Sequence, residues 1–169
     1  MLPRGLHIRA RSLRGVVILL PLSVILLLIY IYLRKKNTLN NSGEIYSLLI
    51  RSGLNETLAR FATAQAAHET NNFTSKIFKS NNNAFGMKYA GQVNAQSVKN
   101  GYANYVSLNY SVADFVSWYS RHRTNILSLP LFINSLESYV RFLKNNNYFE
   151  APESEYLKVC DHFYNLLFA

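Results

Sequence analysis

Glu69 is the residue of this chain best suited to acid catalysis. It lies near the end of a segment of small and apolar residues, Phe61–Thr70, and no other carboxylate follows until Asp114. No lysine or arginine lies between Arg60 and Lys76 to keep Glu69 ionised. Because apolar burial raises the pKa of a carboxyl group, such a group can stay protonated and donate its proton to a leaving oxygen. The sequence therefore predicts a general acid at Glu69, against the ordinary alternative of a solvated glutamate at a helix end.

Other chemistries find less support in the sequence. His68 precedes Glu69, but a zinc-binding His-Glu-x-x-His helix would need a histidine at position 72, which is Asn72. The single cysteine, Cys160, excludes an intramolecular disulfide and fits a buried, inert thiol. We expect neither a metal ion nor another cofactor.

The basic character of the chain is concentrated at its N-terminus. The formal net charge is +9, yet seven of the eighteen lysines and arginines precede Asn37, and eleven bases face nine acids from there onward. A nucleic-acid groove needs a basic surface on the folded part of the protein. We therefore expect no nucleic-acid partner.

A possible membrane anchor explains where these charges lie. Residues 15–33 are nineteen residues without a charge, and as a helix they would span about 28 Å, enough to cross a bilayer core. Tyr30 and Tyr32 fall where aromatic residues favour the membrane interface. A cleaved signal peptide would have a shorter apolar region followed by small residues, whereas Arg34–Lys36 follow here. The sequence predicts a basic segment over residues 1–14 and a transmembrane helix, in contact with lipid, over 15–33.

The remaining residues must position Glu69. The polar residues 34–43 are predicted to form a tether, and residues 44–169 a single mainly helical domain. Apolar spacing and capping residues predict five helices. The first two are a short helix around 45–49 and a helix that is capped by Asn55 and ends at Glu69. The other three run from a Ser111–Asp114 capping box to about Arg123, over 131–144, and from Pro152 onward. Between these helices, the glycine- and asparagine-rich residues 71–107 predict an irregular lobe with a short β-hairpin.

Four motifs resemble, in their order and spacing, those of one enzyme family. They are Ala64–Thr70 (Ala-Gln-x-x-x-Glu-Ser/Thr in the family), Asn83–Lys88 (Asn-x-Phe-Gly-Ile-Lys), Tyr102–Ser107 with Ser111–Phe115, and Asn147–Tyr156 (Gly-Tyr-Ala-Thr-Asp-x-x-Tyr). The chain thereby resembles the bacterial and phage endo-β-N-acetylglucosaminidases of glycoside hydrolase family 73, in the lysozyme superfamily. The resemblance covers roughly residues 54–167. It implies a lysozyme-like α+β fold and cleavage of peptidoglycan on the reducing side of GlcNAc.

The resemblance also implies roles for single residues. Glu69 would be the proton donor, and the Tyr105 hydroxyl would reach the sugar or the attacking water. The residues expected to bind substrate are Gln65, Asn83, Phe85, Gly86 and Tyr102. Asn83, Phe85 and Gly86 would shape a loop under the sugar, with glycine at position 86 because the backbone must approach closely or take a positive φ.

One departure from the family pattern bears on mechanism. Glycosidases usually use two carboxylates, yet no Asp or Glu lies between Thr70 and Ala113, so the small lobe offers no second acid. We expect the 2-acetamido group of the substrate to attack the anomeric carbon, with Tyr105 orienting it. An inverting route with a distant acid, Glu44 or Glu56, is the alternative.

The sequence therefore predicts a membrane-anchored peptidoglycan hydrolase of bacterial or phage origin. The positive charges on both sides of residues 15–33 favour a cytoplasmic N-terminus only slightly. The location of peptidoglycan places the domain outside the cytoplasm, in the periplasm or on the outer face. The alternative is a catalytically inactive glycan-binding or assembly module with the same fold, which a single carboxylate would also suit.

Overall fold

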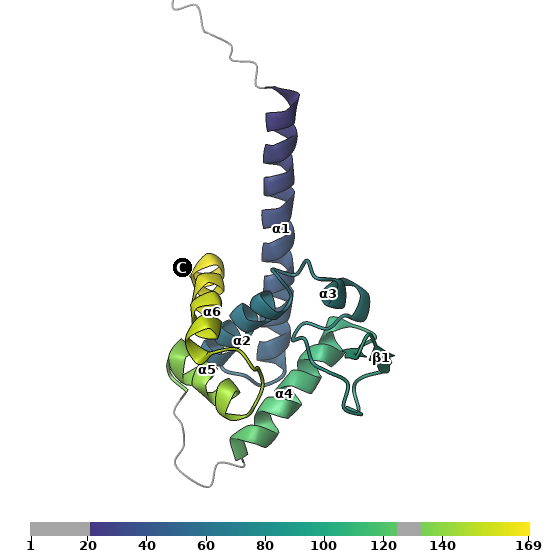
Figure 1. Cartoon of the computed structure of the whole chain (residues 1–169), viewed down its shortest axis with the longest axis vertical. Coiled ribbons are helices and arrows are strands. Elements are labelled where there is room, and N and C mark those ends of the chain that lie inside the picture. The colour runs from purple at the N-terminus through teal and green to yellow at the C-terminus, as the bar shows by residue number, and fades with distance from the viewer. Residues whose placement is uncertain (1–20, 125–132) are drawn as a thin grey trace, which may run out of the picture. The chain divides into compact units, whose positions relative to one another are not determined.

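The computed structural model describes residues 21–124 and 133–169, which are mainly helical. The chain divides into two units, Met1–Leu33 and Arg34–Ala169. In chain order the elements are α1 (Leu22–Arg51), α2 (Glu56–Glu69), α3 (Lys76–Asn81), β1 (Ser97–Lys99), β2 (Tyr102–Asn104), α4 (Leu108–Thr124), α5 (Leu136–Asn145) and α6 (Glu153–Phe168) (Figure 1).

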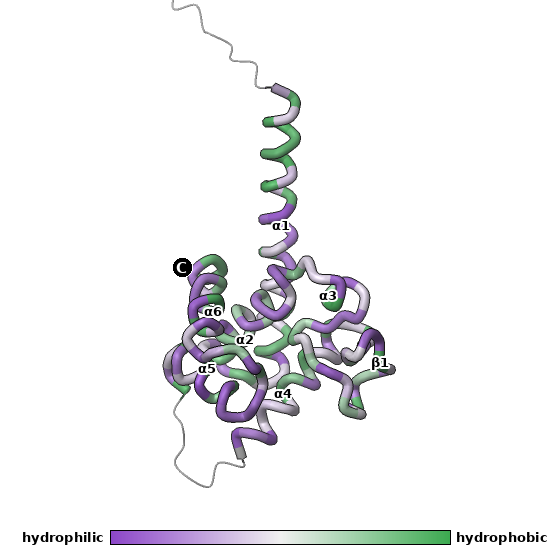
Figure 2. Tube along the Cα trace, in the orientation of Figure 1, coloured by the Kyte–Doolittle hydropathy of each residue, from purple (hydrophilic) through white to green (hydrophobic). Residues whose placement is uncertain are grey.

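The described residues of the first unit form the start of α1. The Pro21 carbonyl accepts hydrogen bonds from the backbone N–H groups of Val24 and Ile25, which begins the helix. Side chains from Leu22 to Leu33 are exposed. Most of these residues are apolar, and Figure 2 colours much of this part of α1 green. Residues 15–20 of the predicted anchor lie outside the described residues. Within the described ranges, no helix meets the length and apolarity that a membrane span requires.

The prediction of an irregular tether over residues 34–43 is wrong, because α1 passes through them without a break. The Thr38 hydroxyl donates to the Arg34 carbonyl and the Ser42 hydroxyl to the Leu39 carbonyl, each at 3.0 Å. Both side chains are buried, ahead of the buried Ile45. Burial of this helix face outweighs the weak helix propensity of the polar residues. The second unit accordingly begins at Arg34 instead of Glu44.

Helix α2 is the central element of the second unit and has the predicted bounds. The Asn55 side chain caps it by accepting from the Leu58 N–H at 2.9 Å. Every residue of α2 from Phe61 to Ala67 is buried, and α2 packs against α5 and α6. The helix ends at Glu69, where the Thr70 N–H returns to the Ala66 carbonyl. Glu69 is thus placed at the C-terminal end of a buried helix.

The small lobe contains the predicted hairpin and one helix that was not predicted. Strands β1 and β2 pair antiparallel around Asn100 and Gly101, both with positive φ, as tight hairpin turns require. Helix α3 forms because Ser75 caps it and Phe78 is buried against Phe73, with ring centroids 5.4 Å apart. Figure 1 shows α3 and β1 on the same side of the molecule.

Two predicted helix starts are wrong. Helix α4 begins at Leu108, so Ser111 and Asp114 are no capping box but lie inside the helix. Their side chains bind other segments: Ser111 Oγ accepts from the Ala84 N–H at 3.0 Å. Helix α5 begins at Leu136, after a cap formed by Ser135, and residues 131–132 of its predicted start lie outside the described residues. The last helix follows Pro152 as predicted.

Candidate active site

The Glu69 carboxyl group is hydrogen-bonded to a tyrosine that lies far away in the sequence. Oε1 accepts a hydrogen bond from the Tyr156 hydroxyl at 2.5 Å. Tyr156 lies on α6 and is buried, whereas Glu69 is half-buried. The packing of α2 against α6 brings these residues together across 87 positions of sequence. The carboxyl group is therefore held in a fixed direction.

The surroundings of Glu69 favour the protonated form of its carboxyl group. Burial raises its pKa, and the hydrogen bond from Tyr156, which stabilises the charged form, lowers it by a smaller amount. The net effect is a carboxyl group that keeps its proton to higher pH than an exposed glutamate. The direction of this pKa shift is the one expected from the sequence, and a carboxyl group that is protonated near neutral pH is what general acid catalysis requires.

Gly86 brings the backbone of the predicted sugar loop against Glu69. Its φ is +61°, and a Cβ atom at this position would lie 3.1 Å from Glu69 Oε2. The positive φ expected for this glycine is present, and the close approach seen in the structure is to the Glu69 side chain. Any side chain at position 86 would crowd the carboxyl oxygen that Tyr156 leaves free.

Asn83 holds the shape of this loop from inside. Its Nδ2 donates to the carbonyls of Met87 and Ala103, at 2.9 and 3.0 Å, and its Oδ1 accepts from the N–H groups of Phe85 and Met87. The side chain is fully buried. It thus has the loop-shaping role that was predicted, with no free polar atom for a sugar.

The other predicted substrate-binding side chains are mostly packed inside the protein. The Phe85 ring is buried and stacks on Phe115 at 4.0 Å. Gln65 is fully buried, and its Oε1 accepts from the Tyr139 hydroxyl. Tyr102 is half-buried on β2. Of these three, Tyr102 is the one whose side chain remains partly open to a ligand.

Tyr105 is placed differently from its predicted role. Its side chain is 2% exposed, and its hydroxyl donates to Asp114 Oδ2 at 2.9 Å. Burial and the neighbouring Asp114 carboxylate raise its pKa. The second Asp114 oxygen accepts from Asn94 Nδ2 at 3.1 Å. Tyr105 and Asp114 thus join the small lobe to α4.

The three carboxylates Glu44, Glu56 and Asp114 are poorly placed to act as a second acid. Glu56 opens the helix that Glu69 ends, so about 20 Å of helix axis separates them, well beyond the roughly 6.5–9.5 Å of inverting enzymes. Glu44 is exposed on α1, and both Asp114 oxygens are hydrogen-bonded. Nor does any cluster of three His, Cys, Asp or Glu side chains among the described residues suit a metal ion.

Sequence reasoning missed Tyr156 and Tyr148 as site residues. The Tyr148 hydroxyl donates to the Phe85 carbonyl at 2.7 Å, and its pKa is raised by burial and by the charges of Glu69 and Tyr105. Both tyrosines occur in the fourth motif of the sequence, which was the available signal. Their roles depend on the direction of the side chains, which the motif does not give.

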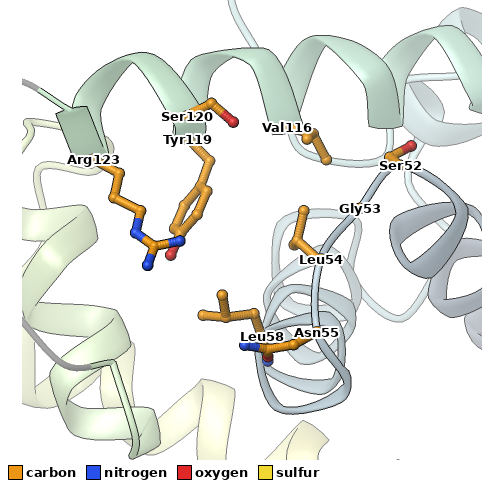
Figure 3. A pocket seen from close by; sticks show the side chains of 9 residues that line it. All are labelled: Ser52, Gly53, Leu54, Asn55, Leu58, Val116, Tyr119, Ser120 and Arg123. Carbon is orange, nitrogen blue, oxygen red and sulfur yellow. The ribbon is translucent and has the colours of Figure 1, made fainter.

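A pocket of about 460 Å³ lies elsewhere, between the start of α2 and the end of α4. Figure 3 shows Leu58, Val116 and Tyr119 directed into it, with Arg123 at one side. No carboxylate lines it, and the length of α2 separates its floor from Glu69. We therefore place the candidate chemistry at Glu69.

Comparisons with known proteins identify the family of this chain and a similar fold. A family profile described as mannosyl-glycoprotein endo-beta-N-acetylglucosaminidase matches residues 51–165. Among solved structures, the catalytic domain of the autolysin Auto from Listeria monocytogenes is similar, with a TM-score of 0.50 and 21% identity over 79% of this chain and 86% of that chain. No curated protein matches the chain. The mainly helical fold with a two-stranded sheet fits the predicted lysozyme-like class.

Proposed function

This chain belongs to the glucosaminidase family and is a glycoside hydrolase, and from this membership we propose that it cleaves peptidoglycan at the β-1,4 bond on the reducing side of GlcNAc. The order of the four sequence motifs supports this bond. The likeness of its fold to the catalytic domain of an autolysin supports a cell-wall glycan as the substrate.

In this proposal Glu69 is the general acid, and the observation that carries it is the environment of the carboxyl group. One oxygen is fixed by Tyr156, the other lies beside the Gly86 backbone, and burial raises the pKa. A carboxyl group so held can protonate the leaving glycosidic oxygen near neutral pH. Glu69→Gln removes the proton and should abolish cleavage while sparing glycan binding.

We further propose that the substrate supplies the second group. The 2-acetamido oxygen of GlcNAc would attack the anomeric carbon and form a cyclic intermediate that water then opens, with retention of configuration. The support is that the small lobe carries no Asp or Glu between Thr70 and Ala113 and that both Asp114 oxygens are hydrogen-bonded. Since the Tyr105 hydroxyl is engaged by Asp114, its expected part in orienting the acetamido group becomes indirect, through the shape of the lobe.

The proposal includes membrane anchoring through residues 15–33, with the N-terminus in the cytoplasm and the domain outside it. It is supported by the nineteen uncharged residues of the sequence and by the exposure of the apolar side chains of 22–33 in the structure. In this orientation the catalytic domain and peptidoglycan lie in the same compartment.

The decisive experiment is mass spectrometry of the products. The full chain in detergent micelles is incubated with purified cell walls, with Glu69→Gln as the control. Products with reducing-end GlcNAc would support the proposal. Reducing-end MurNAc would indicate a muramidase instead, and anhydro-MurNAc a lytic transglycosylase.

Two further readouts separate the alternatives. Proton NMR of the first product formed gives its anomeric configuration, and inversion would exclude participation of the acetamido group. Binding to walls with no released product, by a chain that is folded, would favour the inactive glycan-binding module.

A further inference from the structure

The tyrosine that binds Glu69 is itself held by a phenylalanine. The rings of Phe149 and Tyr156 are stacked, with centroids 3.7 Å apart and planes within 3° of parallel. Phe149 lies in the segment between α5 and α6 and is half-buried.

A lysine also lies over the Phe149 ring. Lys144 Nζ is 5.2 Å from the ring centroid. The ammonium group also donates to the carbonyls of Glu150 and Ala151, both at 2.9 Å. The Phe149 ring is thus held by two neighbours, the Tyr156 ring and the Lys144 ammonium group.

A third ring restricts Tyr156 from its edge. The His68 ring meets Tyr156 in a T-shaped contact, with centroids 4.6 Å apart. A phenol that is fixed by a parallel ring and a perpendicular ring has little freedom to rotate. Its hydroxyl is then directed at Glu69 Oε1 before any substrate arrives.

We propose that Phe149 is a positioning residue that directs the Tyr156 hydroxyl onto Glu69, and that Lys144 holds Phe149 in place. The importance of Phe149 for catalysis rests on the proposed function. The contacts that link Lys144, Phe149 and Tyr156 to one another do not rest on it. The chain of contacts runs from the ammonium group to the ring, from the ring to the phenol and from the phenol to the carboxyl group.

The test uses the titration of Glu69, which needs no substrate. The hydrogen bond from Tyr156 stabilises the ionised carboxylate, so its loss should raise the Glu69 pKa. Carbon-13 NMR of glutamate side-chain carboxyls is recorded against pH on the full chain in micelles, and Glu69→Gln identifies the signal. Three other titratable groups interact electrostatically with Glu69, and burial raises the pKa of each: Tyr139, Tyr148 and Cys160. The adjacent residue His68 is also titratable, and burial lowers its pKa.

Phe149→Leu should move the Glu69 midpoint upward by about half to one pH unit, in the same direction as Tyr156→Phe. Phe149→Tyr, which keeps the ring, should leave the midpoint unchanged. In a Tyr156→Phe background, Phe149→Leu should add no further shift, because the phenylalanine acts through the hydroxyl. An unchanged midpoint in Phe149→Leu, or an equal shift with and without the Tyr156 hydroxyl, would overturn the proposal.

Two variants guard against a general loss of structure. Phe163→Leu makes the same change in a partly buried ring of α6 and should leave the midpoint where it is. Lys144→Met removes the ammonium group over the Phe149 ring and should raise the Glu69 midpoint by less than Phe149→Leu does. This variant tests the proposal if Phe149→Leu does not fold. If the wild-type chain releases no muropeptides, the proposed function fails, and the titration still tests the positioning.

Discussion

At the scale of single residues, the half-buried carboxyl group of Glu69 should affect stability as well as the proposed catalysis. Its pKa is raised in the folded state, so the folded chain binds this proton more tightly than the unfolded chain does. The resulting stabilisation is fully present below the unfolded pKa and is lost as the pH rises through the folded pKa. A buried acid therefore opposes folding at the pH where it ionises.

Glu69→Gln should consequently be stabilising at higher pH. Its melting temperature should match or exceed that of the wild type, and the difference should grow as the pH rises from about 4.3 through the raised folded pKa. Each pKa unit of the shift corresponds to about 1.4 kcal/mol. Calorimetric melting curves of both chains across this range measure it, and a difference that shrinks with pH would contradict the raised pKa.

Gly86 offers a second test at this scale. Gly86→Ala should reduce wall lysis by more than about tenfold, because 1.4 kcal/mol lost in the transition state is already tenfold and the new Cβ would lie 3.1 Å from Glu69 Oε2. Gly91→Ala is the matched control, since Gly91 also has a positive φ but nothing lies within 4 Å of its Cβ position. If Gly86→Ala and Gly91→Ala lose activity equally, backbone strain alone explains the loss, and the contact with Glu69 does not contribute to it.

At the scale of elements, the small lobe is fastened to α4 by polar contacts. The Asp114 carboxylate accepts from Tyr105 and Asn94, and Ser111 accepts from the Ala84 N–H. These bonds fix the end of the hairpin and the Asn83–Gly86 loop on one helix. The lobe therefore has a defined position over α4 without contributing a carboxylate of its own.

Tyr105→Phe distinguishes this fastening role from a chemical one. Removal of the hydroxyl leaves a buried acceptor with one partner fewer, so the free energy of unfolding should fall by about 1–3 kcal/mol, while lysis stays within several-fold of the wild type. Chemical denaturation and a wall-turbidity assay measure the two effects. Abolished lysis with unchanged stability would restore the catalytic role expected from the sequence. Tyr110→Phe, at an exposed position of α4, is the control.

The continuity of α1 gives another prediction for an element. Asn41→Pro removes a helical N–H inside residues 34–43 and should lower the free energy of unfolding by about 3 kcal/mol. Asn41→Ala should be neutral or slightly stabilising. Thermal unfolding of the full chain measures both, and a proline that is tolerated would indicate that these residues are a tether after all.

At the scale of the whole molecule, the proposal requires the chain to partition into membranes. An arginine near the middle of the apolar stretch opposes insertion by about 2.5–3.5 kcal/mol, so Leu27→Arg combined with Val24→Arg should move the expressed chain from the alkali-resistant membrane fraction to the soluble fraction. Leu27→Ile with Val24→Leu should leave it in the membrane. Soluble wild-type chain would contradict the anchor.

The sequence by itself determined the helix that ends at Glu69, the presence of a short hairpin in the small lobe and the family, because caps, glycines and apolar spacing act over a few residues. It misjudged residues 34–43, where tertiary packing buries one face of a polar helix, and the start of α4, where Ser111 and Asp114 bind other segments of the chain. Tertiary structure alone decided that Tyr156 holds Glu69 and that Tyr105 faces Asp114. Those contacts depend on how α6 and the lobe pack, and side-chain direction after packing is not written in local spacing.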